Sequence, residues 1–136
     1  MIKIYLASRY SRFQEMQNYR ASLRSWGYEV TSRWINGDHQ SSEAAILATD
    51  RASQEERVRF ATEDLADLQA ADWVISFTEE PRATNSRGGR HVEFGIALAA
   101  RKRCIVIGPR ENVFHCLPQV RWFPTWEAFA SSGMMD

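Results

Sequence analysis

Three features are scarce or absent in this sequence: an excess of one charge, cysteine, and long apolar runs. Lys and Arg together number 17, as do Asp and Glu, so no net charge favours nucleic acid or an anionic membrane surface. No apolar run approaches the length of a transmembrane helix, and residues 1–3 lead into an expected strand instead of a signal peptide. We therefore expect neither nucleic acid nor a membrane as a partner.

Only two cysteines are present. Cys104 lies in an apolar, strand-like stretch and Cys116 in an expected loop, without the close spacing of a paired-cysteine motif. This usage favours two free thiols in a reducing cytoplasm. A zinc site built from His39, His115 and Cys116 has no motif spacing, so we predict no metal.

The length of 136 residues predicts one domain, residues 1–136, large enough to bury a core. Short apolar runs rich in β-formers predict strands at 2–7, 28–34, 72–77, 104–107 and 120–123. Residues 35–52 are polar and poorly periodic, which predicts a loop with some helix over the mouth of the fold.

Helices are expected between these strands. Ser11 and Gln14 form a capping box for a helix that ends before Gly27, and Ser53 and Glu56 form another. In the second helix Val58, Ala61, Leu65 and Leu68 are expected to mark the apolar face, with Asp64 beside it, midway between Phe60 and Leu68. Thr125 is expected to cap a last short helix.

Alternating strands and helices predict an α/β fold with a parallel sheet and right-handed crossovers. Five strands of this size favour a single Rossmann-like, flavodoxin-like domain with strand order 2-1-3-4-5 and helices on both faces. In that order strands one and three are neighbours whose following loops leave on opposite faces. Ligands bind in the crevice at such a switch point. Residues 5–9 and 78–93 would meet there.

The stretch from Ser86 to Ala100 is the centre of the functional prediction. Gly88 and Gly89 precede an Ala-rich apolar run, which predicts a loop turning into a helix. Amide N–H groups and the positive dipole end at such a junction favour an anion, and Arg87, Arg90 and His91 would add side-chain donors.

Glu93 is expected in the first turn of that helix, where the dipole lowers a carboxyl pKa and opposes the effect of burial. We therefore expect Glu93 to stay ionised even in a dry cleft, as suits a nucleophile. The alternative is an ordinary glutamate that only stabilises its helix. Likewise, Tyr5 could be a core residue, Asp64 could simply flank its helix, and Arg9 could be a solvated loop charge.

An ordered set of short motifs resembles the nucleoside 2-deoxyribosyltransferase family, including its nucleoside 5′-monophosphate N-glycosidase branch. The set covers most of the chain: Ile4-Tyr5-Leu6-Ala7-Ser8, Glu63-Asp64-Leu65, Ala71-Asp72-Trp73-Val74, Gly89-x-x-x-Glu93-x-Gly95-x-Ala97, Lys102-x-x-Ile105 and Gly108-Pro109-Arg110. None of these pieces is diagnostic alone. Their common order is what carries the resemblance.

The resemblance implies a retaining mechanism without metal or organic cofactor. Glu93 would attack C1′ of the sugar and form a covalent ester while the base departs. Asp64 matches the carboxylate that binds or protonates the base, and Tyr5 matches the tyrosine that holds the nucleophile by a hydrogen bond. Transfer to a second base or release to water would complete the reaction on a small-molecule nucleoside or nucleotide.

Two departures point to different branches of the family. Where the transferases present an acidic residue for the 5′-hydroxyl, this chain has Arg87 with Ser86 adjacent, which favours a 5′-phosphate. Ser8, Arg9, Gly88 and Gly89 would complete that subsite. Residues 112–114, in contrast, resemble the C-terminal Asn segment that transferases lend to a neighbouring subunit, so Asn112 implies a substrate contact and a homodimer or higher homo-oligomer.

Two other functions stay open at the level of sequence. A non-catalytic nucleotide-sensing module could use the same fold, since fold alone does not fix function. A glycohydrolase acting on a larger ligand such as NAD would also depend on a glutamate. The presence of all three residues, Glu93, Asp64 and Tyr5, argues against a protein that only senses nucleotides, because such a protein needs no nucleophile.

Overall fold

The computed structural model describes residues 1–38, 50–81 and 88–133. These residues form a five-stranded sheet in which every neighbouring pair of strands is parallel. The strand order is β2-β1-β3-β4-β5, which confirms the predicted order. The strands are β1 (Lys3–Ala7), β2 (Glu29–Val30), β3 (Trp73–Phe77), β4 (Arg103–Ile107) and β5 (Arg121–Phe123).

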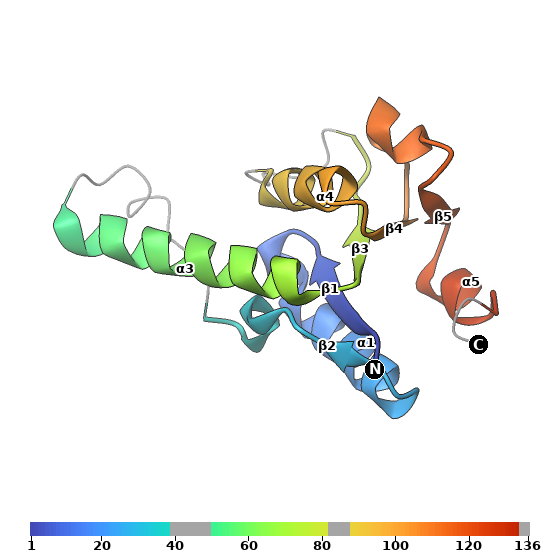
Figure 1. Ribbon diagram of the computed structural model, residues 1–136, viewed down its shortest axis with the longest axis horizontal. Helices are drawn as coiled ribbons and strands as arrows, with labels where there is room; N and C mark the ends of the chain where they lie inside the picture. The colour runs from blue at the N-terminus through green and yellow to red at the C-terminus, as the bar shows by residue number, and fades with distance from the viewer. Residues whose placement is uncertain (39–49, 82–87, 134–136) are drawn as a thin grey trace.

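Helices cover both faces of this sheet (Figure 1). The described helices are α1 (Phe13–Ser25), α3 (Arg51–Ala70), α4 (Gly89–Ala99) and α5 (Trp126–Ala130), with short 3-10 segments η1 (Tyr10–Arg12), η2 (Arg33–Asn36) and η3 (Val113–Cys116). Tyr5 on one face bonds to α4, whereas Phe77, on the opposite face, stacks on α1 and α5. In Figure 1 the first half of α3 extends well beyond the sheet.

The three inner strands of the sheet are deeply buried. All five residues of β3 are buried, as are four of the five in β1 and in β4, because helices pack on both faces of the sheet. None of the described helices is long and apolar enough to cross a membrane.

Two predicted helix starts are wrong. Helix α1 begins at Phe13 after a 3-10 turn, without a side-chain cap, so Ser11 does not form a capping box. Helix α3 begins at Arg51 because the carboxylate of Asp50 accepts the backbone N–H of Ser53. An acidic cap three residues earlier, Asp50, therefore replaces the predicted one at Ser53.

The predicted apolar face of α3 is also wrong in part. Val58 and Leu65 are exposed, and the buried residues are Phe60, Asp67 and Leu68. The placement of Asp64 is confirmed, since it lies between buried Phe60 and Leu68 at helical spacing.

The predicted strand at 28–34 is much shorter in the structure. After the backbone N–H of Thr31 bonds to Ile4, the Ser32 hydroxyl accepts the N–H of Leu6 and ends the strand ladder. The chain then turns into η2, where the Trp34 indole N–H donates to the Leu6 carbonyl at 2.9 Å. At the other end of the chain, the predicted cap at Thr125 is confirmed, since its hydroxyl accepts the N–H of Ala128.

Candidate active site

Tyr5 and Glu93 form a direct contact between β1 and α4. The Tyr5 hydroxyl donates a hydrogen bond to Oε2 of Glu93 across 88 positions of sequence. Tyr5 is fully buried at the centre of the sheet. No other hydrogen bond to the Glu93 carboxyl involves a described residue, so its second oxygen, Oε1, accepts none from that part of the chain.

The ionisation state of the Glu93 carboxyl differs from the prediction. Burial raises its pKa to about 8; the Tyr5 hydrogen bond opposes this shift, and the negative charge of Asp64 adds to it. Helix α4 begins at Gly89, so Glu93 lies in the second turn, where the dipole has weakened. The expectation of an ionised Glu93 is therefore wrong for neutral pH in the ligand-free protein, because desolvation outweighs the dipole.

Asp64 reaches the same pair from α3. Its charge raises the pKa of Glu93, and it also raises that of Tyr5, behind burial and the charge of Glu93. The structure thus brings the three predicted catalytic residues together from three elements that are far apart in sequence. The charge of Asp64 therefore opposes ionisation of both Tyr5 and Glu93, whereas the hydrogen bond from Tyr5 favours ionisation of Glu93.

Ser8 and Arg9 follow β1 at the carboxyl edge of the sheet. The Ser8 hydroxyl donates to the Arg9 carbonyl at 2.9 Å. Arg9 Nε lies 3.5 Å from Glu79 Oε1, and Arg12 Nη1 lies 2.6 Å from the other oxygen of Glu79. Arg9 is therefore part of an ion-pair network that joins the ends of β1 and β3, while its side chain is 37% exposed.

Gly88 and Gly89 stand at the start of α4, as predicted. Gly88 has φ +85° at the N-cap, a left-handed conformation that favours glycine. Among the described residues, nothing lies within 4 Å of a Cβ built on either glycine. Ser86 and Arg87, which were predicted to belong to the same subsite, lie outside the described residues.

Arg90 does not serve the predicted anion site. It is buried and forms a double hydrogen bond with the carboxylate of Glu111, whose other donor is the backbone N–H of Glu79. Burial raises the pKa of Glu111, but these hydrogen bonds outweigh it and the pKa ends below its ordinary value. His91 Nε2 lies 3.6 Å from the same carboxylate. The partner at Glu111 was not predicted, because no local pattern links positions 21 residues apart.

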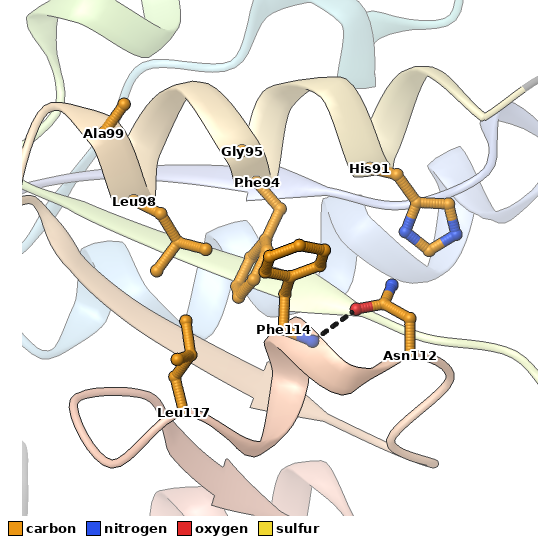
Figure 2. A pocket seen from close by; sticks show the side chains of 8 residues that line it. All are labelled: His91, Phe94, Gly95, Leu98, Ala99, Asn112, Phe114 and Leu117. Atoms are coloured by element: carbon orange, nitrogen blue, oxygen red, sulfur yellow. Dashed lines mark hydrogen bonds between the residues drawn. The ribbon is translucent and has the colours of Figure 1, made fainter.

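Asn112 lines a pocket of about 700 Å³ on the flank of α4 that faces η3 (Figure 2). Its Oδ1 accepts the backbone N–H of Phe114 at 3.0 Å and so caps η3. Figure 2 shows its amide nitrogen pointing toward His91, and the rest of the wall is mostly apolar. Lining residues are His91, Phe94, Gly95, Leu98, Ala99, Asn112, Phe114 and Leu117. Glu93 is not among them, so this pocket and the Tyr5 contact lie on different sides of α4.

Within the described ranges no three His, Cys, Asp or Glu side chains are grouped so that they could hold a metal ion. Cys104 is a buried free thiol and Cys116 an exposed one. His39 of the zinc alternative falls outside those ranges.

No protein-family model matches the sequence, and no curated protein matches it. Solved structures do. A 2-deoxyribosyltransferase from Bacillus psychrosaccharolyticus superposes with a TM-score of 0.69 at 20% identity, over 95% of this chain and 90% of that one. The Clostridium botulinum CMP N-glycosidase BcmB gives a TM-score of 0.57 at 19% identity, over 89% and 87%.

A third structure, the 2-deoxyribosyltransferase of Leishmania mexicana, gives a TM-score of 0.53 at 16% identity, over 79% of this chain and 64% of that one. At such identities the likeness establishes the fold alone. The resemblance noted in the sequence is thus confirmed at that level: this chain has the α/β fold of 2-deoxyribosyltransferases and of a nucleoside monophosphate N-glycosidase.

Proposed function

We propose that this protein cleaves the N-glycosidic bond of a nucleoside, or of its 5′-monophosphate, through a covalent glycosyl intermediate on Glu93. The observation that carries the proposal is the hydrogen bond from Tyr5 to Glu93, with the charge of Asp64 acting on both residues. This arrangement lies at the switch point between β1 and β3, where folds of this kind bind ligands.

In the first step an ionised Glu93 oxygen attacks C1′, and the C1′–N bond breaks with its electron pair going to the base. Tyr5 holds Oε2, which leaves Oε1 for the attack. Asp64, when protonated, gives its proton to the departing base, so that a neutral base leaves. The products of this step are the free base and a glycosyl ester of Glu93.

In the second step another base, or a water molecule, attacks C1′ from the face that the first base left. The ester C–O bond breaks and Glu93 regains its negative charge. Asp64 takes the proton that the incoming nucleophile loses, which restores the starting state. Two inversions at C1′ give net retention of configuration.

The 5′ end of the substrate would lie against Ser8, Arg9, Gly88 and Gly89, with Ser86 and Arg87 completing an anion subsite. Arg9 would have to exchange its contact with Glu79 for a phosphate oxygen. Because Arg12 also pairs with Glu79, the exchange would leave that carboxylate with a partner. A bound phosphate therefore does not leave an unpaired charge at this edge of the sheet.

The chain is also proposed to assemble as a homodimer or higher homo-oligomer through the η3 side of α4. Phe114 lines the mostly apolar pocket and is 59% exposed, and Val92 of α4 is 63% exposed. Apolar surface of this kind is buried in interfaces. Asn112 lies on the same surface and would be the residue nearest a partner's site, whereas His115 is buried within its own subunit.

The deciding experiment incubates the protein with a panel of ribo- and deoxyribonucleosides and their 5′-monophosphates, each with and without a second base. Chromatography would detect released base and any new nucleoside, and intact mass would detect a sugar adduct on the wild type but not on Glu93→Gln. Binding without turnover for every compound would favour the sensing module instead. Turnover restricted to NAD would favour the glycohydrolase.

A further inference from the structure

Ser76 is a hydroxyl residue in an otherwise apolar, fully buried strand. It lies in β3 and has no solvent exposure, and its Oγ has no hydrogen-bond partner among the residues that the structure describes. An unsatisfied buried hydroxyl is costly compared with a methyl group of similar size. Its presence there calls for a partner in some state of the protein.

The register of the sheet places Ser76 on the face that carries the candidate site. Ser76 is paired with Ala7 of β1, and Tyr5 is paired with Val74. Since side chains alternate along a strand, Tyr5, Ala7, Val74 and Ser76 all point to the side covered by α4. Ser76 lies two positions nearer the carboxyl edge of the sheet than the partner of Tyr5.

Glu93 is near that same edge. Helix α4 follows β3 in a parallel crossover, so its N-terminal half lies over the carboxyl ends of the strands. Tyr5 bonds to Glu93 from the same face of the sheet as Ser76, so the Ser76 hydroxyl and the Glu93 carboxyl both lie between this face and α4.

We propose that Ser76 is a positioning residue for Glu93, and that its hydroxyl donates a second hydrogen bond to the ionised Glu93 carboxylate beside the bond from Tyr5. A carboxylate has about four acceptor sites, and the described residues fill one of them. The proposal gives the unpaired hydroxyl a partner and the nucleophile a second donor. It deepens the proposed function, and the hydrogen bond that it assigns to the ionised carboxylate can be tested without turnover.

Two other titratable groups act on the Glu93 carboxyl: Tyr5 from β1, as a hydrogen-bond donor, and Asp64 from α3, through its charge. A donor at Ser76 adds a neutral group that stabilises only the ionised form. Losing it should therefore raise the pH at which Glu93 ionises, without changing the charge of the site.

The test is a carbon-13 NMR titration of the glutamate carboxyls in the ligand-free protein, with Glu93→Gln to assign the Glu93 signal. We expect Ser76→Ala to raise the Glu93 midpoint by about one pH unit, since a hydrogen bond to a charged group is worth roughly that much. Ser76→Thr, which keeps a hydroxyl, should shift it less than half as far. Tyr5→Phe, which removes an observed donor, is the positive control and should also raise it.

An unchanged midpoint in Ser76→Ala, with a raised midpoint in Tyr5→Phe, would overturn the proposal and leave Ser76 as a small residue that fills the sheet. Ser76→Ala should fold, because it removes only an unpaired hydroxyl, and Ser76→Cys provides a second variant of similar size. The titration needs no substrate. A shifted midpoint in a protein that turns over none of the panel would therefore contradict the proposed function while supporting the role of Ser76.

Discussion

The Tyr5 hydroxyl and the Glu93 carboxyl are joined by a hydrogen bond that links β1 to α4. The bond lowers the pKa of Glu93, yet burial and Asp64 bring it to about 8. A single donor is thus too little to keep this carboxyl ionised at neutral pH. The consequences for activity, stability and substrate choice can each be measured.

Removing the Glu93 carboxyl should abolish the covalent route. We expect Glu93→Gln and Glu93→Ala to fold and to lose at least ~10³-fold in kcat/KM, because no other group can form the glycosyl ester. Glu56→Gln, which changes an exposed glutamate of α3, is the matched control and should keep wild-type activity. A folded Glu93→Ala protein with near-normal turnover would refute the assignment of the nucleophile.

The raised pKa of Glu93 should also be visible as a cost to stability. Between about pH 4.5 and 8 the unfolded chain has lost the Glu93 proton while the folded protein keeps it, so this residue lowers stability as the pH rises through that window. Glu93→Gln removes the effect. Its midpoint of thermal unfolding should exceed that of the wild type by a few degrees at pH 8 and by much less at pH 5. Equal differences at both pH values would contradict the raised pKa.

Much of the fold was predictable because it depends on local patterns. The strand at 72–77 and the cap at Thr125 follow from short apolar runs and one side chain, and the strand order follows from the alternation of elements. The prediction of a strand over 28–34 failed because the Ser32 hydroxyl, instead of a backbone carbonyl, accepts the N–H of Leu6. A side-chain bond of this kind across the sheet has no signal within its own segment.

In the candidate site, too, local patterns were predictable and contacts between distant segments were not. The residue types at Tyr5, Asp64 and Glu93 were found from motifs, since their order along the chain matches the family resemblance. The predicted ionisation of Glu93 was wrong because burial raises its pKa and because α4 begins at Gly89, which places the carboxyl in the second turn, further from the positive end of the helix dipole. The pairing of Arg90 with Glu111 was missed because tertiary packing alone brings them together.

Asp64 should matter only when the leaving base needs a proton. We expect Asp64→Asn to slow cleavage strongly for ordinary bases, and much less for a synthetic substrate whose leaving group departs as a stable anion. Comparing kcat for both kinds of substrate in one variant controls for any general damage to the fold. Equal losses for the two would exclude an acid role and leave Asp64 as a binding residue.

The η3 side of α4 should be covered by a second copy of the chain. We expect a dimer or larger oligomer by sedimentation, and we expect Phe114→Glu to weaken it, since a charge placed in an apolar contact opposes burial. Val58→Glu is the matched control, because Val58 is exposed to a similar extent on α3. A fully active wild-type monomer at working concentration would refute both the assembly and a role for Asn112 across it.

The last prediction concerns the 5′ end of the substrate. A hydrogen bond between charged groups contributes about 1.5–3 kcal/mol, which corresponds to roughly 10- to 150-fold in binding. We therefore expect a 5′-monophosphate to be used at least as well as its nucleoside, with the preference falling at high salt. Arg87→Ala and Arg9→Ala should each lower kcat/KM for the monophosphate at least tenfold and leave the nucleoside nearly unchanged.

Arg51→Ala is the control for this series, because Arg51 is an exposed arginine at the start of α3 that pairs with Glu55. Arg51→Ala should leave kcat/KM unchanged for both the nucleoside and its monophosphate. Asn112 carries the opposing expectation, since its segment resembles that of transferases acting on free nucleosides. If the nucleoside is preferred by a wide margin in the wild type, and Arg87→Ala and Arg9→Ala alter neither value of kcat/KM, the two arginines do not form a phosphate subsite. The free nucleoside would then be the substrate, and Asn112 the residue to test next.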